Sequence, residues 1–368
     1  MKDDVQKGKT WTINGRFIAQ QVTGVQRYAC EIVRSLDEVL FANPDVAARL
    51  NFQLVMPADA KTQPLLNRIP CRASFFGSGH LWEQLVLPWY ERTGILSLGN
   101  FGPAAAHCDV VCIHDANTFL EPDSYSKTFR SSYRALLPII GKRAGRVATV
   151  SEYSANMLAR FGIAPRDKIF VAGNGHEHVR RWNPERATLP LLKSLRRPYV
   201  LLLGSQAKHK NIEVVLAGAQ ALDAAAIDLV IVGSASRIFL NTPEVRAPNT
   251  HYVGYVSDDD LAALYERAFC LAFPSTTEGF GLPPLEAMAS GCPVISSNAA
   301  SLREVGGEAV QYVNPLARAD WPQAIIELSK NEQRRKELIM RGTERARLFS
   351  WQRSAEIYID ELLQMNCR

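Results

Sequence analysis

The sequence predicts an α/β protein made of two doubly wound domains, each with a parallel sheet covered by helices. Short apolar runs of strand length alternate with helical patterns in both halves of the chain. A polar stretch with two prolines, residues 180–197, interrupts this alternation near the middle and is typical of an interdomain linker. The length of 368 residues also favours two cores over one.

The composition is that of a soluble globular protein, with 47% hydrophobic and 21% charged residues. The net charge of +5 fits an anionic ligand or membrane surface, and we expect no nucleic-acid partner. Residues 1–10 lack the apolar core of a signal peptide, and no apolar run reaches the about 20 residues that span a bilayer. Seven scattered cysteines argue against a disulfide framework. We therefore expect a cytoplasmic protein, with peripheral contact to the inner face of the membrane as a further hypothesis.

The first half opens with a strand, a glycine turn and a helix, the order that begins a doubly wound unit. The strand covers residues 11–14, the turn contains Thr23 and Gly24, and apolar residues recur at helical spacing from Val25 to Leu36. An ordinary loop glycine is the alternative for Gly24. Later strands are predicted at residues 52–56, 109–113, 146–150 and 168–172.

Three residues of the first half are candidates for contact with a substrate. His114 and Asp115 follow the strand 109–113, and open α/β sheets bind ligands at the carboxyl ends of their strands. Trp82 can stack on a sugar, although packing is the commoner role of a tryptophan. Cysteine is also common in cores, so we expect no metal at a cluster around the same strand: His107, Cys108, Cys112 and His114.

Residues 124–145 predict a basic amphipathic helix, with Pro138 placed to kink or divide it. Its cations alternate with apolar residues such as Phe129 and Leu136. We expect this face to contact anionic lipid headgroups, with an ordinary solvated helix as the alternative.

The second half repeats the alternation of strands and helices. Strands are predicted at residues 199–203, 229–232, 251–256, 270–274, 292–296 and 309–313. Helices are predicted at residues 212–222, 258–268, 321–328, 332–349 and 351–365. Parallel strands with right-handed crossovers end at one edge of the sheet, so four strand ends should lie there together: Gly204, Gly233, Gly254 and Ser275.

The stretch STTEGFGLPPLEAMASGCPVISS, residues 275–297, joins two of these strands through a loop and a short helix. Glu278 lies in the glycine-rich loop, and Pro283 suits the opening of the helix. Glu286 is expected in the first helical turn, and Gly291 should end the helix in a left-handed cap. Loop glycines and a helix N-terminus suit a bound phosphate.

Lys208 and Lys210 follow Gly204 and can neutralise a diphosphate at the same edge. Carboxylates accept but do not donate hydrogen bonds, so Glu278 and Glu286 suit sugar hydroxyls. A ligand with phosphate in the middle and hydroxyls at both ends is a nucleotide sugar. The acids at residues 258–260 begin a helix, where acids are expected, so we predict no metal there and no cofactor.

The second half resembles the family 4 glycosyltransferases of the GT-B fold, in which two Rossmann-like domains with parallel sheets face a central cleft. The resemblance rests on VLLLGSQAKHKN, LVIVGSAS, YVGYVSDDDLAALYERA and AFPSTTEGFGLPPLEAMASGCPVISS, with Glu278 and Glu286 at the E-x7-E spacing. TGVQRYACEI and VSEYS agree in the first half, and FSWQRSAEIY resembles the helix that crosses back onto the first domain. The implied domains are 1–185 on the acceptor side, 186–345 for the nucleotide sugar, and 346–368 crossing back.

The resemblance implies retaining transfer of a sugar from a nucleotide diphosphate donor without a bound metal. Glu286 would hold the ribose, Glu278 would face the donor sugar, and Lys210 would neutralise the leaving diphosphate. Donor contacts are also implied for Gly24, Gly204, Lys208, Tyr255, Val256, Gly279, Phe280, Gly281 and Leu282. On the acceptor side the candidates are His114, also counted as catalytic, Asp115 and Trp82.

Two departures from the family pattern bear on these roles. Ser205 and Gln206 stand where many relatives have an arginine, which leaves the role of Lys208 open. The loop after Gly173 continues as NGHEHV, where an aliphatic residue and an acid are usual. A front-face mechanism is what the family implies, and Glu278 as a covalent nucleophile is the alternative.

LWEQLVLP and TGVQRY resemble bacterial mannosyltransferases of surface polysaccharide assembly, lipopolysaccharide included. GDP-mannose is therefore the expected donor, and a glycan or lipid-linked glycan the expected acceptor. Two alternatives remain: a nucleotide-sugar epimerase that uses His114 or Asp115, and a non-catalytic nucleotide-sugar-binding subunit. A nicotinamide dehydrogenase is disfavoured, because no G-x-G-x-x-G follows either opening strand.

Overall fold

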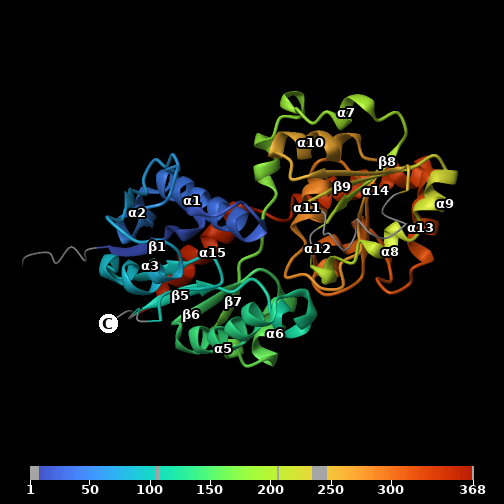
Figure 1. The fold of residues 1–368 in the computed structure, drawn as a ribbon. Helices are drawn as coiled ribbons and strands as arrows, with labels where there is room; N and C mark the ends of the chain where they lie inside the picture. The colour runs from blue at the N-terminus through green and yellow to red at the C-terminus, as the bar shows by residue number, and fades with distance from the viewer. Residues whose placement is uncertain (1–7, 105, 107, 205–206, 234–246, 367–368) are drawn as a thin grey trace, which may run out of the picture. The chain divides into compact units, whose positions relative to one another are not determined.

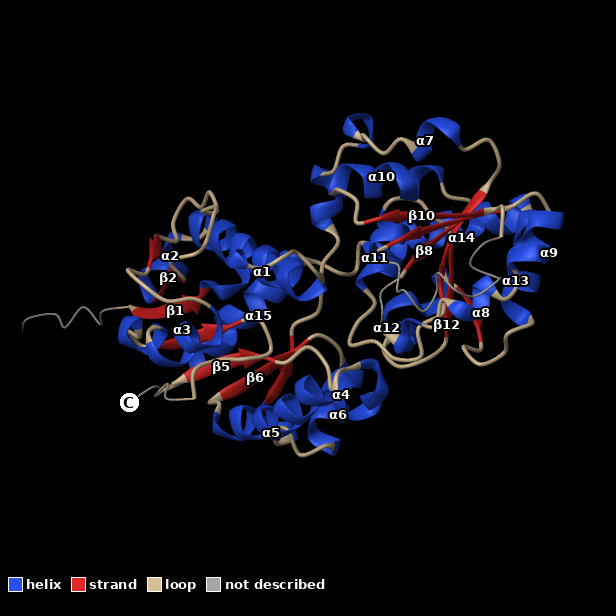
Figure 2. Ribbon diagram, in the orientation of Figure 1, coloured by secondary structure: helices blue, strands red, loops and turns tan. Residues whose placement is uncertain are grey.

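The computed structural model describes residues 8–366 apart from 105, 107, 205–206 and 234–246. It divides into two compact units. Unit 1 contains Met1–Ala116, Ser131–Gly175 and Ser350–Arg368, and unit 2 contains Asn117–Arg130 and His176–Phe349. Each unit has a parallel sheet with helices on its faces (Figure 2), which confirms the predicted fold class.

Unit 1 is built on a seven-stranded parallel sheet in the order β3-β2-β1-β4-β5-β6-β7. Its strands are β1 (Lys9–Asn14), β2 (Leu50–Met56), β3 (Cys71–Ala73), β4 (Gly94–Ser97), β5 (Asp109–Cys112), β6 (Arg146–Thr149) and β7 (Ile169–Val171). Its helices are α1 (Gly24–Ala42), α2 (Pro44–Arg49), α3 (Gly79–Leu85), most of α5 (Lys127–Arg143), α6 (Glu152–Arg160) and α15 (Trp351–Gln364).

The last helix, α15, packs on α1 and completes the core of unit 1 (Figure 1). Tyr28 of α1 is fully buried; its ring meets Trp351 edge-on, and its hydroxyl lies 3.0 Å from that of Tyr358. At the other end of α15, Lys9 Nζ donates hydrogen bonds to the carbonyl oxygens of Leu363 and Met365, at 2.8 and 2.6 Å. The C-terminal residues therefore belong structurally with the first strand and helix.

Helix α5 runs without a break through Pro138, so this proline does not divide the helix, and the alternative, a kink, stays a prediction. Leu137 and Ile140 on either side of it are buried, and their packing offsets the loss of one helical hydrogen bond. Of the basic residues, Arg130 lies within 3.8 Å of Asp123, whereas Arg134 and Lys142 are exposed.

Unit 2 is built on a six-stranded parallel sheet in the order β10-β9-β8-β11-β12-β13. Its strands are β8 (Tyr199–Leu203), β9 (Asp228–Val232), β10 (Thr250–Gly254), β11 (Cys270–Phe273), β12 (Val294–Ser297) and β13 (Gln311–Val313). Its helices are α4 (Asn117–Leu120), α7 (Leu191–Ser194), α8 (Glu213–Leu216), α9 (Ala219–Ala224), α10 (Asp258–Arg267), α11 (Leu282–Ala289), α12 (Leu302–Gly306), α13 (Asp320–Ser329) and α14 (Glu332–Ala346).

The helix predicted at residues 212–222 is two short helices, α8 and α9, separated at Gly218. A Cβ atom on Gly218 would lie 2.5 Å from Pro322 Cβ, so glycine lets α13 pack closely at the break. Two other helices begin after a serine cap, as a serine directly before a helical pattern predicts: the side chains of Ser151 and Ser257 accept hydrogen bonds from amides of the first turn.

The acids that begin α10 hold the polar stretch 180–197, which belongs to unit 2. Asp259 accepts a hydrogen bond from the amide of Asn183 at 2.7 Å, and Asp260 accepts from the amides of Thr188 and Leu189 at 2.6 and 2.9 Å. Burial alone would raise the pKa of Asp260, but its hydrogen bonds hold that pKa below the ordinary value. These acids anchor backbone, and in the described part of the chain no group of acids, histidines and cysteines has the arrangement of a metal site.

Two further findings bear on the sequence expectations. None of the helices within the described ranges is both long and apolar enough to cross a bilayer. Cys108 is disulfide-bonded, so its sulfur is not a thiolate metal ligand. Free thiols are found at Cys30, Cys71, Cys112, Cys270 and Cys292.

Candidate functional site

The loop between β11 and α11 carries Glu278 and has a constrained backbone. Gly281 has a φ of +109°, and a Cβ atom there would lie 2.7 Å from Leu302 Cδ2. The hydroxyl of Ser301 lies 3.0 Å from the carbonyl oxygen of Glu278 and 2.7 Å from that of Phe280. These contacts fix the position of Glu278 within unit 2 through the backbone on both sides of it.

Lys210 and Glu278 form an ion pair with an Nζ–Oε1 distance of 2.7 Å. Their side chains are 23% and 12% exposed, so solvent reaches both. Asn211, next to Lys210, has a φ of +52° and donates its side-chain amide to the carbonyl oxygens of Pro274 and Pro315, at 3.1 and 2.8 Å. The structure therefore brings together two charges that the sequence placed only at a common sheet edge.

This ion pair suits a ligand with both phosphate and hydroxyl groups. An ammonium group can exchange its carboxylate partner for a phosphate oxygen, and the carboxylate can then accept hydrogen bonds from hydroxyls. The N-terminus of α11, which starts at Leu282 just beyond the loop, adds backbone amides and a partial positive charge.

Glu286 lies in the second turn of α11, so its predicted place in the first turn was wrong. Side chains hold its carboxylate instead: His178 Nε2 donates to Oε1 at 2.9 Å, and the Tyr265 hydroxyl donates to Oε2 at 3.2 Å. His178 and Tyr265 are fully buried, and Glu286 is 5% exposed. A carboxylate offers about four acceptor positions, so Glu286 retains capacity for ribose hydroxyls after these two bonds.

His178 and Tyr265 are functional candidates that the sequence reasoning missed. His178 follows Gly175 in NGHEHV, and the only available signal was that this run departs from the family pattern. Tyr265 sits at an apolar position of α10, where an aromatic residue simply predicts core. Neither position is adjacent to Glu286 in sequence, so only the fold reveals the group.

Glycines form the carboxyl ends of three adjacent strands of unit 2. The amide of Gly204 donates to the carbonyl of Val232, and that of Gly233 donates to the carbonyl of Gly254, both at 2.8 Å. A Cβ atom on Gly233 would lie 1.8 Å from the Gly204 oxygen, so only glycine fits there. The two residues expected to frame the base follow this edge directly, with the first 70% exposed: Tyr255 and Val256.

His209 lies between the two lysines of the loop after β8 and is 6% exposed. Its amide donates to Ser124 Oγ at 3.1 Å, and its carbonyl accepts from the amide of Thr276 at 2.8 Å. Burial, followed by the nearby charge of Lys210, lowers the pKa of His209 to about 4, so the imidazole is neutral near pH 7. Through the hydrogen bond between its carbonyl oxygen and the amide of Thr276, His209 connects the loop of Lys210 to the loop of Glu278.

The remaining donor-side assignments stay predictions. Lys208 is exposed at the start of the same short helical turn as Lys210. Phe280 and Leu282 are buried at the entrance to α11, where only their backbone amides suit a ligand. The positions that depart from the family's arginine, Ser205 and Gln206, lie outside the described residues.

His114 belongs to unit 1 and is engaged by its own surroundings. It is 7% exposed; its Nε2 donates to the carbonyl of Leu98 at 2.9 Å, and its amide donates to Asn100 Oδ1 at 2.9 Å. Its ring meets Tyr28 edge-on at 4.9 Å between centroids. Burial lowers the pKa of His114 to about 4, so it is a neutral imidazole near pH 7.

The other first-half candidates differ in what the structure allows. Asp115 is half-buried beside His114. A Cβ atom on Gly24 would meet no atom within 4 Å, so packing does not require glycine at the start of α1. The acceptor role of Trp82 is not supported, because this residue is 1% exposed and its Nε1 donates to Ser74 Oγ at 2.8 Å. In that position its ring packs in the core and cannot stack on a sugar.

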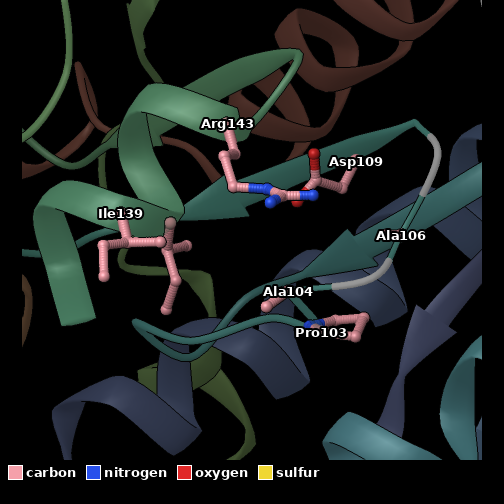
Figure 3. A pocket seen from close by; sticks show the side chains of 7 residues that line it. Pro103, Ala104, Ala106, Asp109, Ile139 and Arg143 are labelled. Carbon is pink, nitrogen blue, oxygen red and sulfur yellow. The ribbon is translucent and has the colours of Figure 1, made fainter.

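A shallow pocket of about 180 Å³ lies at the amino end of β5, where Arg143 reaches toward Asp109 (Figure 3). Burial raises the pKa of Asp109 to about 6. Because parallel α/β sheets bind ligands at the opposite, carboxyl edge, this pocket is not part of the candidate site.

The family model for glycosyl transferases group 1 matches residues 190–345. The chain is 30% identical over 256 residues to O-antigen chain mannosyltransferase B of Escherichia coli, covering 66% of this chain and 67% of that protein. It is 29% identical over 220 residues to O-antigen chain mannosyltransferase RfbU of Salmonella typhimurium strain LT2, covering 58% of this chain and 59% of that relative.

Among solved structures, sucrose-phosphate synthase from Thermosynechococcus elongatus superimposes with a TM-score of 0.71 at 20% identity, covering 96% of this chain and 98% of that one. This similarity shows a shared GT-B fold. Together with the match to the second half and the similarity to mannosyltransferase B, it identifies the chain as a member of the group 1 glycosyl transferases.

Proposed function

We propose that this protein transfers mannose from GDP-mannose to a glycan or lipid-linked glycan, with retention of configuration and without a bound metal. The contact between Lys210 and Glu278 carries the proposal, because it puts a cation for phosphate and an acceptor for sugar hydroxyls in one place. Glu286, eight residues on, supplies a second carboxylate for the ribose. The sequence relatives named as mannosyltransferases support mannose as the transferred sugar.

In the proposed reaction, an acceptor hydroxyl oxygen bonds to the anomeric carbon as the bond from that carbon to the diphosphate oxygen breaks. The hydroxyl proton passes to the leaving phosphate oxygen, and the nucleoside diphosphate departs. Lys210 stabilises the negative charge that grows on the leaving group. The backbone amides of Phe280, Gly281 and Leu282 would add hydrogen bonds to the sugar or phosphate.

Glu278 as a covalent nucleophile is the alternative route to retention. In that case the donor alone would leave a hexose on the wild-type enzyme, and the Glu278→Gln variant would not acquire it. Intact-mass measurement of both proteins after incubation with GDP-mannose distinguishes the routes. No added mass on either protein supports direct transfer on the front face.

We also propose that His114 and Asp115 contact the acceptor side of the substrate and that Gly24 lets its loop approach the donor phosphates. The neutral state of His114 suits a hydrogen-bonding role better than a proton-transfer role near pH 7. Conversion of the donor to an epimer without any acceptor would instead identify an epimerase.

The experiment that tests the proposal is a thermal-shift series with nucleotides and nucleotide sugars, followed by transfer assays with and without EDTA. GDP and GDP-mannose should stabilise the protein more than their uridine counterparts, because ligand binding to the folded state raises the melting temperature. A preference for UDP-sugars would overturn the donor assignment alone. Tight donor binding with neither transfer nor hydrolysis would instead indicate a non-catalytic binding subunit.

Product analysis completes this test. An α-linked mannosyl product from the α-linked donor would support retention, and unchanged transfer in EDTA would support metal independence. We further propose that the protein acts at the cytoplasmic face of a membrane, where a lipid-linked acceptor is available.

A further inference from the structure

Five large apolar side chains of unit 1 are exposed within fifteen residues of sequence. They are Phe75 (95% exposed), Phe76 (57%), Leu81 (75%), Leu85 (64%) and Trp89 (78%). Two of them lie in α3 and the others lie just before or after it, and we call the set the apolar face of α3. Exposed apolar residues that stand singly are ordinary on protein surfaces. Five such residues within one short segment favour an interaction surface.

The segment that carries the apolar face also contributes a separate set of apolar residues to the core of unit 1. Trp82, Val86 and Leu87 lie on the inner side of the same segment, buried against β2 and β4. Leu81, Leu85 and Trp89 recur every four residues between these buried positions. The segment therefore has two apolar sides, whereas a surface helix that buries only one has a polar outer side.

The loop before α3 and the residues after it form one patch. The rings of Phe76 and Trp89 meet edge-on, with centroids 6.5 Å apart. A Cβ atom on Gly77 would lie 3.3 Å from the Trp82 ring, so the loop packs directly over the helix. The ring of Phe76 therefore lies beside that of Trp89, and the loop that carries Phe76 and Gly77 packs over α3.

Cations border this patch in the chain. Residues 73–79 carry no charge, and four exposed cations flank the patch in sequence: Lys61, Arg68, Arg72 and Arg92. Fewer acids are exposed in the same stretch of sequence, namely Asp59 and the half-buried Glu91. Glu83 is not among them, since it is buried and paired with Arg16. An apolar segment that is rich in Trp and Phe and is flanked by cations in sequence complements the interface of an anionic bilayer.

We infer that the apolar face of α3 inserts into the headgroup region of an anionic membrane and so holds the protein at the bilayer surface. The basic helix α5 is the weaker candidate, since beyond Arg130 its exposed large apolar residues are Leu136 and Ile139, which are only 45% and 51% exposed. The inference concerns where the protein binds, so its test needs no sugar transfer and its failure leaves the proposed function intact.

Flotation with vesicles of phosphatidylethanolamine and phosphatidylglycerol tests the inference on the full-length protein. The wild type should float with these vesicles and much less with phosphatidylcholine alone. The double variant Phe75→Ser/Trp89→Ser should lose about tenfold or more of the bound fraction, because it removes two of the anchoring aromatic rings. A second double variant, Leu81→Ser/Leu85→Ser, should weaken flotation through the helix itself.

Three controls make the outcome decisive. Leu316→Ser removes a side chain of unit 2 that is also 78% exposed, and it should float as the wild type does. Arg134→Gln/Lys142→Gln tests α5 and should leave most of the binding intact. Circular dichroism and melting temperature should be unchanged in all variants, since every replaced side chain is exposed.

Two results would overturn the inference. One is unchanged flotation of both α3 double variants with loss of flotation on neutralising α5. The other result concerns self-association. If the wild type sediments as a dimer, and Phe75→Ser/Trp89→Ser sediments as a monomer but still binds vesicles, the apolar face joins two copies of the chain.

Discussion

The carboxyl ends of the two sheets are built from different kinds of contact. In unit 1 the polar side chains there are held by hydrogen bonds within the unit: Glu83 accepts from Asn14 at 2.6 Å and from Arg16 at 3.2 Å, and His114 donates to a main-chain carbonyl. In unit 2 glycines end three adjacent strands, and the pair Lys210–Glu278 remains within reach of solvent.

From this difference we infer that the carboxyl edge of the sheet in unit 2 is organised for a ligand and that of unit 1 for stability. Replacing a charged residue at the edge of unit 2 should reduce activity and leave the fold intact. Replacing a polar residue at the edge of unit 1 should change stability first. The predictions that follow test this contrast, beginning with the largest expected effect.

Lys210→Met should lower kcat/KM by about 100- to 1,000-fold, because the leaving diphosphate loses its cation in the transition state. The melting temperature should change little, since a partly exposed ion pair contributes at most about 1 kcal/mol. Steady-state kinetics and thermal unfolding measure the two effects. Lys208→Met is the matched control and should have a much smaller kinetic effect; equal effects of the two variants would contradict the assignment.

His114 should make stability depend on pH. Its pKa is lowered from 6.5 to about 4 on folding, so between these values the unfolded chain binds more protons than the folded one. His114 should therefore contribute a fall of about 3 kcal/mol in the free energy of unfolding as the pH drops from 6.5 to 4, and nothing above that window. His209, whose pKa is also lowered to about 4, should add a fall of its own in the wild type and the variant alike. Urea unfolding of the wild type and His114→Gln measures this, and the variant should show a shallower pH dependence. Parallel curves would show that His114 is not the group responsible.

His178→Phe should destabilise the protein by about 2 kcal/mol, because it leaves the buried Glu286 oxygen without its donor. It should also raise the KM for the donor by more than it lowers kcat, since Glu286 is proposed to bind the ribose in ground and transition states alike. Tyr265→Phe is the matched control: it deletes only the hydroxyl that donates a hydrogen bond to the other carboxylate oxygen of Glu286, Oε2. A stability loss with an unchanged KM would assign His178 a purely structural role.

Gly281→Ala should destabilise unit 2 by about 1–2 kcal/mol, since alanine is strained at a φ of +109°. The Cβ atom also meets Leu302, so Leu302→Ala in the same chain should recover the steric part of the loss. Thermal unfolding measures both. Gly24→Ala is the control with open space around it and should leave stability unchanged; a comparable loss there would remove the contrast between the two glycines.

The sequence predicted the fold and most of the elements because strand runs and helix caps are local signals. Ser257 as a cap and Gly291 as a left-handed helix end are examples of residues whose role depends only on near neighbours. The break at Gly218 was missed because its cause, the approach of Pro322, lies a hundred residues away.

The candidate site was predictable in part for the same reason. Glu278 and Lys210 follow strand ends, and strand ends of a parallel sheet share an edge. The partners of Glu286 were not predictable, because His178 and Tyr265 reach it from two other segments. Trp82 was assigned wrongly because a tryptophan pattern alone does not say which side of a segment faces the core.

The position of α15 has a consequence for how the protein is made. Tyr28 is synthesised long before Trp351 and Tyr358, the two residues that cover it. During translation unit 2 can fold while unit 1 still waits for its final helix, because domains generally fold as their chain emerges. Unit 1 therefore completes its core only after α15 has left the ribosome, and a nascent chain halted at residue 349 would present α1 to chaperones as an uncovered apolar surface.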